Sequence, residues 1–293
     1  MKILTTTCSD LSKAAEIRKR GADEIIIACK DQTFSAMKEY SEKEIVSFIS
    51  EGHELGLKVS VLMNRLYGQQ EIAESQSLLK HLLENDVDYV YFSDPGLFNE
   101  ALRIHQESRM IYDPGTLMTS AEDASFWMEQ GLASVVISPL ITEEEILRIA
   151  EKIPHTTLII HGRELMSVSK RHLLSAYREV SGKKLDPDYN AHLTIRENKR
   201  ESRMPVYENA YAMMVYTDFI QESFNEMNAL MENGVERYVI EDIFLDQNPF
   251  LDAIRAYRKI LDGADAMKTG KEYRERYSDL PLSSGYYGQK TIR

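Results

Sequence analysis

The sequence has little cysteine and no long hydrophobic run, and each shortage excludes a class of protein. Cys8 and Cys29 are its two cysteines in 293 residues. Two thiols are too few for a disulfide framework, a structural zinc site or an iron–sulfur cluster held by cysteines alone. We therefore expect no metal and no bound cofactor, and a reducing, cytoplasmic location. No apolar run approaches the roughly 20 residues of a membrane helix, and the first residues show no signal-peptide pattern.

Positive charge is also in short supply. Lys and Arg number 35 against 47 Asp and Glu, so the net charge is −12. This balance disfavours non-specific adhesion to nucleic acid or to anionic membranes, although it does not describe a local patch. The chain contains neither the G-x-S-x-G turn of serine hydrolases nor the H-E-x-x-H zinc motif. The first predicted strand leads into TTTCSD without a glycine, so a dinucleotide-binding fold loses its main support.

What the chain does contain is a repeated alternation of β-rich and helical segments. Ser41 with Glu44, and Thr142 with Glu145, form capping-box patterns that mark helix starts. Strands buried on both faces and separated by helices predict a parallel sheet with right-handed crossovers. Eight such units favour a closed TIM-type (β/α)8 barrel, an α/β fold, over an open sheet. The predicted strands are 3–8, 24–29, 58–64, 89–94, 109–113, 134–138, 157–161 and 237–243.

The seventh unit interrupts the alternation. We expect the barrel to occupy residues 1–262, with an insertion at 173–219 that contains a short β-ribbon. Residues 263–293 are polar, and their main apolar content is a set of tyrosines. We expect this tail to pack on the barrel surface and not to form a domain.

Polar side chains gather at the predicted C-terminal ends of the strands, where barrel enzymes place their active sites. His161 ends an apolar strand, and a neutral imidazole can exchange protons near pH 7. The catalytic candidates are His161, Arg163, Asp94, Asn64 and Glu208. The alternatives are structural: His161 can be a buried, hydrogen-bonded ring, and Asp94 and Asp113 precede prolines as helix caps do. A thiol nucleophile, Cys8 or Cys29 with His161, is a further alternative that no nearby charge supports.

A basic segment follows His161. Residues 161–203 carry ten Lys or Arg against six Asp or Glu, a net +4 that leaves −16 on the rest of the chain. Such a concentration of positive potential suits a partner with phosphates or several carboxylates. The predicted RNA or anion contacts are Lys170, Arg171, Lys183, Lys184, Lys199 and Arg200. The alternative is a solvated insertion, because residues 196–203 mix both signs and can pair internally.

Part of this segment resembles the signature of a known family. His161-Gly162 followed by SKRHLLSAY at 169–177 is similar to the signature region of peptidase family U32, the collagenase-like proteases. The resemblance covers nearly the whole chain and is nearest to the short, single-barrel type that occurs beside a longer paralogue in Gram-positive bacteria. Further matching pieces, in chain order, are Gly21-Ala22-Asp23, Phe34-Ser35, Asn64, Asp94-Pro95-Gly96, ESRMPVYE at 201–208 and Ser284-Gly285-Tyr286-Tyr287.

The resemblance implies a function in RNA modification. Better-understood branches of the family act in oxygen-independent hydroxylation of the tRNA wobble uridine, of a ribosomal RNA cytidine or of a ubiquinone precursor. Prephenate is implicated as a co-substrate in the RNA reactions, and this chain looks like the tRNA branch. Leu165 and His172 stand where the cluster-binding branch has cysteines, so the resemblance implies no iron–sulfur cluster.

Other departures bear on whether the chain acts alone. Met37 and Pro139-Leu140 stand where the family usually has charged site residues, which fits a subunit that supports a longer U32 paralogue. Two alternative functions stay open. One is a U32-type peptidase with His161 as general base, and the other is a non-catalytic subunit that binds RNA or stabilises a partner.

Overall fold

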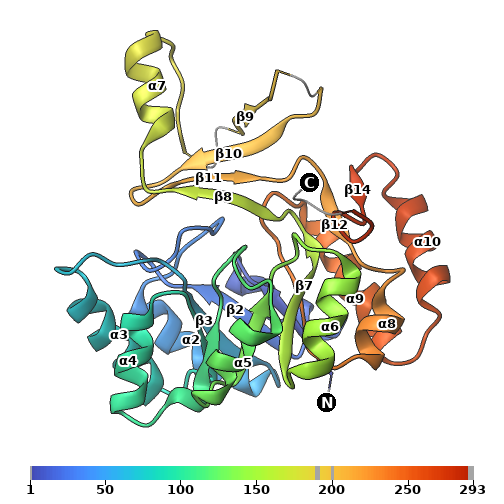
Figure 1. Ribbon diagram of the computed structural model, residues 1–293, viewed down its shortest axis with the longest axis horizontal. Coiled ribbons are helices and arrows are strands. Elements are labelled where there is room, and N and C mark those ends of the chain that lie inside the picture. Colours follow the sequence, from blue (N-terminus) through green and yellow to red (C-terminus); the bar gives the residue numbers. More distant parts are fainter. Residues whose placement is uncertain (1, 189–191, 199–200, 290–293) are drawn as a thin grey trace.

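The computed structural model describes residues 2–188, 192–198 and 201–289, and its centre is a closed barrel of eight parallel strands (Figure 1). Each strand pairs with the next, and the last pairs with both the seventh and the first, which closes the ring. The prediction of a TIM-type barrel is confirmed, and the predicted strand limits differ from the observed ones by a few residues. The strands are β1 (Ile3–Thr7), β2 (Glu24–Ala28), β3 (Lys58–Met63), β4 (Tyr89–Phe92), β5 (Met110–Tyr112), β6 (Ser134–Ile137), β7 (Thr156–Gly162) and β13 (Val235–Ile240).

Helices cover the outside of the ring and bury the outward-facing apolar side chains of the strands. Both predicted capping boxes are present, so Ser41 and Thr142 begin helices as expected. Short 3-10 turns occupy Leu11–Lys13 and Glu107–Arg109. The helices of the ring are α1 (Ala14–Arg20), α2 (Glu42–Glu54), α3 (Ile72–Glu84), α4 (Pro95–Arg103), α5 (Ala121–Glu129), α6 (Glu143–Lys152), α8 (Met227–Glu232) and α9 (Gln247–Leu261).

The inside of the barrel is filled by side chains. Its middle layer consists of Ile26, Leu62, Tyr91, Ile111, Val136 and Val239. Toward the N-terminal ends of the strands, Glu24 forms a buried ion pair with Arg237 and accepts a hydrogen bond from Ser60 Oγ at 2.6 Å. The Tyr91 hydroxyl donates to the Glu24 carboxylate at 3.2 Å. These hydrogen bonds help to offset the cost of removing the Glu24 charge from water. The interior of the barrel is therefore packed, and the C-terminal mouth is the usual place for a ligand in this fold.

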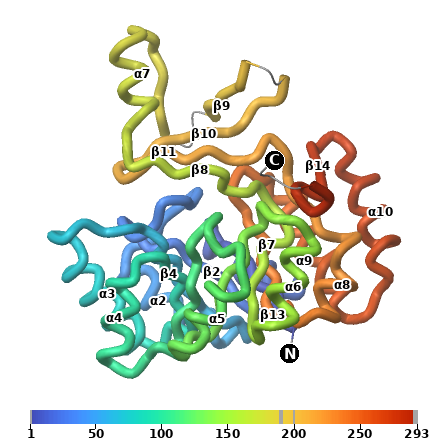
Figure 2. The backbone as a smooth tube through the Cα atoms, viewed as in Figure 1, coloured from blue at the N-terminus to red at the C-terminus, as the bar shows by residue number. Residues whose placement is uncertain are grey.

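A second, antiparallel sheet interrupts the barrel after β7, and we call it the lid sheet. Its strands, in spatial order, are β8 (Leu165–Ser169), β11 (Met213–Tyr216), β10 (Met204–Glu208) and β9 (Thr194–Ile195). It spans the space above the barrel mouth, and α7 (Leu173–Ser181) stands out from it (Figures 1 and 2). The expected ribbon is present as β10 and β11. The excursion begins at Leu165, earlier than the predicted residue 173, because β8 itself pairs with β11.

The chain after α9 packs against the side of the barrel. Helix α10 (Ala266–Arg276) lies along α9, and β14 (Leu282–Ser283) pairs with β12 (Ile220–Glu222), which pairs with the end of β7. Tyr273 and Tyr287 are buried in this region. Among the described helices, none has the length and apolar composition needed to cross a membrane.

Candidate functional site: a cleft between barrel and lid

A cleft of about 480 Å³ lies between the barrel mouth and the lid sheet. Asn64, Ser93 and Tyr112 line it from the ends of β3, β4 and β5, and residues 165–168 of β8 line it from above. Lys170 lies at the rim, where its Nζ donates to the carbonyl oxygen of Leu66 at 3.3 Å. The volume is in the range of small-molecule sites, and the walls are mainly apolar.

Asn64 is a polar group of this cleft whose amide orientation is fixed. Its Oδ1 accepts hydrogen bonds from Thr33 Oγ1 at 2.7 Å and from the Phe34 backbone N–H at 3.3 Å. Both lone pairs of that oxygen are therefore used. Its Nδ2 lies 3.5 Å from Asp113 Oδ2 and retains a second N–H. Asn64 can therefore only donate to a ligand, which suits a carbonyl oxygen.

Carboxyl groups, and not cations, gather at the centre of the mouth. Burial, and then repulsion from Asp113 and Asp242, raises the pKa of Glu241 to about 8. Burial also raises the pKa of Asp113. The pKa of Glu164 is raised well above its usual range by burial and by Glu241. A carboxyl group that stays protonated at pH 7 can donate a hydrogen bond to an acceptor.

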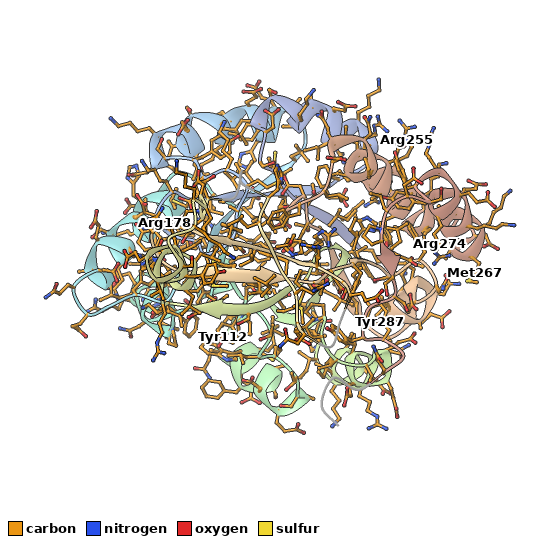
Figure 3. All side chains as sticks on the ribbon, turned by 90° about the horizontal axis from the view of Figure 1, so that it is seen from above. Tyr112, Arg178, Arg255, Met267, Arg274 and Tyr287 are labelled. Carbon is orange, nitrogen blue, oxygen red and sulfur yellow. The ribbon has the colours of Figure 1, made fainter. Side chains whose placement is uncertain are left out.

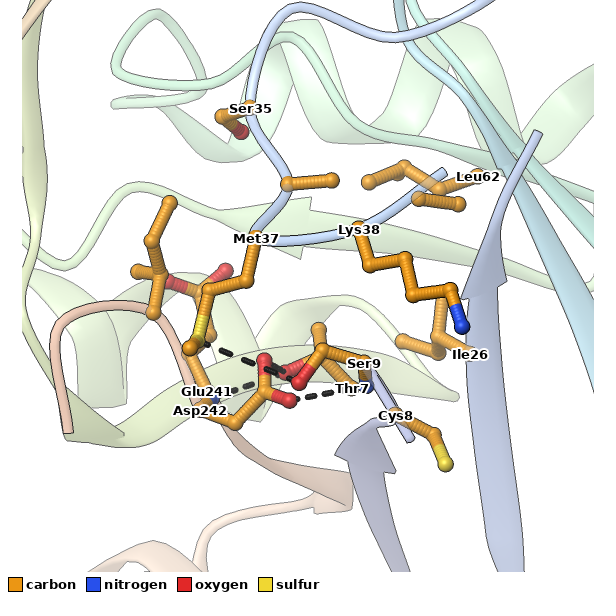
Figure 4. Close-up of a pocket in the computed structure, with 13 residues that line it drawn as sticks. Thr7, Cys8, Ser9, Ile26, Ser35, Met37, Lys38, Leu62, Glu241 and Asp242 are labelled. Atoms are coloured by element: carbon orange, nitrogen blue, oxygen red, sulfur yellow. Dashed lines mark hydrogen bonds between the residues drawn. The ribbon is translucent and has the colours of Figure 1, made fainter. Parts of the chain in front are cut away.

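A smaller hollow of about 30 Å³ lies where β1, β2 and β13 end (Figure 4). Figure 4 shows Met37 and Lys38 on one side of it and Glu241 and Asp242 on the other. Asp242 accepts hydrogen bonds from Thr7 Oγ1 and from the Ser9 backbone N–H, both at 2.8 Å. The hollow has room for little more than one water molecule, so it is too small for a substrate.

The two cysteines are poor nucleophiles. Cys8 lines the small hollow but is buried, and burial raises the pKa of its thiol to about 12. Burial likewise raises the pKa of Cys29 to about 12. The thiolate is the reactive form, so the alternative of a cysteine nucleophile loses its physical basis.

The structure places His161 outside the mouth, which corrects the expectation that it faces the rim. Its ring is fully buried and packs against Phe224. The hydroxyl of Tyr257 lies 3.4 Å from Nδ1, and that of Tyr273 lies 3.3 Å from Nε2. Burial lowers the pKa of the imidazole to about 3, so the ring stays neutral. These surroundings match the structural alternative.

A β-bulge in β7 is the reason for this placement. Val239 of β13 pairs with Ile159, whereas the next residue, Ile240, pairs with His161. Strand β7 therefore has one extra residue at this point. Ile159 packs with the interior of the barrel and Ile160 with the outer core. Without the bulge, Ile159 and His161 would share the inward face.

Arg163 and Asp94 form hydrogen bonds to backbone groups around the site, and their role is structural. The Nη1 of Arg163 donates to the Thr217 carbonyl oxygen at 2.7 Å, which ties the exit of β7 to the end of the lid sheet. Asp94 is the N-cap of α4, and its Oδ1 accepts from the Gly96 N–H at 2.7 Å. Its Oδ2 accepts from the Tyr67 N–H at 2.9 Å. The capping alternative for Asp94 therefore describes its contacts.

Glu208 has a similar structural position under α7. Its buried carboxylate accepts from the Leu174 N–H at 2.9 Å and from Ser175, and His172 Nδ1 lies 3.5 Å away. It therefore serves the first turn of α7 as a capping group does. Of the five catalytic candidates, Asn64 is the one that lines the cleft.

The predicted anion contacts follow the chain from the rim of the cleft onto the projecting helix. Lys170 lines the cleft, and Arg171, Lys183 and Lys184 are exposed. The Nζ of Lys183 donates to the Tyr177 hydroxyl at 2.8 Å. Lys199 and Arg200 lie outside the described residues.

Sequence reasoning missed the upper wall of the cleft and the aromatic side chain in its lower wall. The segment LMSVS at 165–169 forms β8, the upper wall of the cleft. Tyr112 belongs to the lower wall of the same cleft. Tyr112 stacks on Trp127 with ring centroids 3.9 Å apart, which holds it in place. A short alternating run directly after Gly162 was the available signal for β8.

Comparison with known families and proteins adds to this geometry. The family model described as Peptidase family U32 matches residues 9–291. The chain belongs to peptidase family U32. Among the described residues of this U32 protein, no group of three or more His, Cys, Asp or Glu side chains is placed to hold a metal ion.

Several relatives of this U32 protein carry names that refer to RNA. The tRNA hydroxylation protein P2 of Bacillus subtilis (strain 168) is 21% identical over 268 residues, which cover 87% of each chain. The 23S rRNA 5-hydroxycytidine C2501 synthase of Escherichia coli (strain K12) is 22% identical over 88% of this chain but 39% of its own length. A solved structure described as the U32 peptidase Mk0906 has a TM-score of 0.52 and 15% identity. It covers 82% of this chain and 92% of its own, and shows the shared fold.

Proposed function

We propose that this U32 protein acts in the hydroxylation of tRNA at the wobble uridine, and that the cleft receives the reacting nucleoside. The observation that carries the proposal is the match to the tRNA hydroxylation protein P2 over 87% of both chains. A match of that extent covers most of both chains. The proposal therefore does not depend on a short shared fragment.

The geometry of the cleft supports a nucleoside as the ligand. RNA-binding proteins recognise single-stranded bases by stacking on aromatic rings and by hydrogen bonds to the base edges. Tyr112 supplies a ring, Asn64 supplies a donor for a ring carbonyl, and Lys170 at the rim supplies a charge for a phosphate. Uracil has two carbonyl oxygens, so it can meet the Asn64 donor in either orientation.

The charge distribution supports an RNA partner on the same side of the molecule. Lys170 and Arg171 lie where β8 leads toward α7, and Lys183 and Lys184 follow α7. The chain as a whole is acidic, and these cations lie on its lid side. RNA phosphates are therefore attracted to the lid side. Lys199 and Arg200 belong to the same proposal on sequence grounds.

A carboxylate-bearing co-substrate such as prephenate is part of the proposal. Ionised carboxylates at the mouth would repel such a molecule. The raised pKa of Glu241 keeps that side chain protonated near pH 7, so the mouth is less negative than its composition indicates. The amide of Asn64, which lines the cleft, is a donor for a carboxylate oxygen. A longer U32 paralogue as partner is proposed on the same resemblance.

A peptidase is the second candidate, because of the family's name and the solved relative. Its proposed base, His161, is buried among tyrosines with a pKa of about 3. The cysteine thiols are held protonated. The geometry of the described residues thus gives the peptidase hypothesis less support than RNA modification.

The test is a deletion strain of the source organism, complemented with plasmid copies of the gene. Mass spectrometry of its tRNA nucleosides should show the hydroxylated uridine product lost on deletion and restored by the wild-type gene. The double variant Lys170→Glu/Arg171→Glu should restore less than about a tenth of it, because reversed charges repel phosphates. The matched control is Lys19→Glu/Lys43→Glu, two exposed lysines on α1 and α2, which should restore it fully.

Other outcomes separate the alternatives. A product that persists in the deletion strain contradicts the proposal. Salt-sensitive binding of tRNA by the purified protein without any change in the nucleosides would favour a non-catalytic RNA-binding subunit. Cleavage of gelatin that is lost in Asn64→Ala but kept in Cys8→Ser would favour the peptidase.

A further inference from the structure

Helix α7 leaves a stripe of large apolar side chains in solvent. Leu173, Tyr177 and Val180 are 46%, 48% and 90% exposed. They are spaced at i, i+4 and i+7, so they lie on one face of the helix. Of the nine residues of α7, Leu174 is the one that is buried. The helix therefore turns most of its apolar surface away from its own chain.

This arrangement needs an explanation, because a helix of this length is not stable by itself. Isolated helices shorter than about 12 residues are marginal in water, and tertiary packing normally holds them. Figures 1 and 2 show α7 standing out above the lid sheet, away from the helices of the barrel. A contiguous exposed apolar stripe on a projecting element is typical of an interaction surface.

The charges around the stripe indicate an acidic partner. Arg171, Arg178, Lys183 and Lys184 flank it and are exposed, against one exposed acid on α7, Glu179. The ammonium group of Lys183 lies 5.4 Å from the centre of the Tyr177 ring. RNA would satisfy the cations but not Leu173 and Val180, which offer neither a stacking face nor a hydrogen bond. A protein surface that combines carboxylates with an apolar side chain satisfies both.

The chain itself carries such a surface on α5. Phe126 is 57% exposed and its ring is supported edge-on by Trp127 at 5.5 Å. The exposed carboxylates Glu122, Asp123 and Glu129 lie four and three residues before it and three after it, on the same side of the helix. Helix α5 contains no Lys or Arg. Glu122 pairs with Lys152 of α6 at 3.8 Å, which leaves Asp123 and Glu129 as the carboxylates beside Phe126 without an ion pair to a lysine or arginine of α5 itself. It flanks the barrel below the lid sheet, well separated from α7 (Figure 1).

We propose that α7 docks on α5 of a second copy of this chain. The stripe of Leu173, Tyr177 and Val180 would cover Phe126. Arg178 of α7 and the lysines that follow the helix would face the carboxylates of α5. In a two-fold dimer each copy gives one α7 and one α5, so the contact forms twice. This interface goes beyond the proposed function: it leaves the cleft open, although Lys183 is also one of the proposed RNA contacts.

The first test is sedimentation velocity of the full chain over a series of concentrations. The wild type should show a reversible monomer–dimer equilibrium. Tyr177→Ser/Val180→Ser should raise the dimer Kd by about tenfold or more, because central apolar anchors dominate such interfaces. Met267→Ser is the matched control: this side chain on α10 is 59% exposed and lies at the far end of the molecule from Arg178 (Figure 3). Circular dichroism verifies that each variant is folded.

The second test reverses the charges. Arg178→Glu/Lys183→Glu and Glu122→Lys/Asp123→Lys should each weaken the dimer, whereas a mixture of the two variants should restore it, because both contacts are then complementary. A wild type that stays monomeric at every concentration overturns the proposal, as does a mixture that fails to associate. A monomer whose affinity for tRNA falls in Tyr177→Ser/Val180→Ser assigns the stripe to RNA and also overturns it.

Discussion

At the scale of single residues, His161 and Asn64 both lie near the C-terminal ends of barrel strands, yet their surroundings give them different chemistry. Asn64 has its carbonyl oxygen engaged by Thr33 and Phe34, so its amide nitrogen is left to face a ligand. His161 is turned outward by the bulge in β7 and packs among aromatic rings. The same position in the barrel pattern thus gives a binding group in one strand and a core residue in another.

We predict that His161 acts in stability and not in proton transfer. His161→Ala should lower the free energy of unfolding by about 2–4 kcal/mol, because it leaves a cavity among buried rings. His161→Phe keeps an aromatic ring at this position and should cost less. The measurement is urea unfolding, combined with tRNA nucleoside analysis in the complemented deletion strain. A folded His161→Phe protein that yields no hydroxylated product would restore the catalytic role of the imidazole.

Glu241 should make stability depend on pH. Its carboxyl group has a pKa of about 8 in the folded state and close to 4.5 in the unfolded state. As pH rises between these values, the unfolded state loses its proton first, so the free energy of unfolding falls. Glu241→Gln removes this loss and should stabilise the protein at pH 8 by about 1–3 kcal/mol. Urea unfolding of the wild type and of Glu241→Gln at pH 5 and pH 8 measures this stabilisation. An equal change in the free energy of unfolding at both pH values would contradict the pKa shift.

At the scale of elements, the lid sheet is fastened to the barrel by the turn between β10 and β11. The guanidinium group of Arg65 lies 3.9 Å from the centre of the Tyr211 ring. The Tyr211 hydroxyl donates to Asp31 Oδ1 at 2.8 Å, and Asn209 Nδ2 donates to the Phe34 carbonyl oxygen at 3.0 Å. The turn therefore fixes the distance between the two walls of the cleft.

Removing this fastening should loosen the lid sheet. Tyr211→Ala loses both the cation–π contact and the hydroxyl bond, and we expect amide hydrogens of β10 and β11 to exchange at least about fivefold faster, for a loss near 1 kcal/mol. Tyr211→Phe keeps the ring and should have a smaller effect. Hydrogen exchange followed by mass spectrometry measures it. Unchanged exchange in β10 and β11 would show that other contacts hold the lid sheet.

The sequence predicted elements where local signals decide them. Both capping boxes and all eight barrel strands were found, because caps and buried apolar runs are set by residues near in sequence. Strand β8 was missed, since it has no buried apolar run and pairs with β11 more than 40 residues later. The inward or outward direction of His161 depends on one extra residue relative to β13, which alternation within β7 does not reveal. Asn64 was found because no bulge intervenes at the end of β3.

At the scale of the whole molecule, the barrel is acidic and the lid side carries the excess of cations. The cleft lies between them, with Asn64 and Tyr112 in its lower wall and Lys170 at its rim. This separation of charge orients a polyanion toward the lid sheet without spreading it over the barrel. The central claim is that the RNA reaction takes place in this cleft.

Filling the cleft tests that claim most directly. Ser167 is exposed on β8 and lines the cleft, whereas Thr194 is exposed on the edge strand β9. Each is replaced by Trp in the complemented deletion strain, with protein levels matched, and the hydroxylated uridine of tRNA is measured by mass spectrometry. Ser167→Trp should abolish the product and Thr194→Trp should leave it at the wild-type level. A wild-type level of product from folded Ser167→Trp protein would contradict the account.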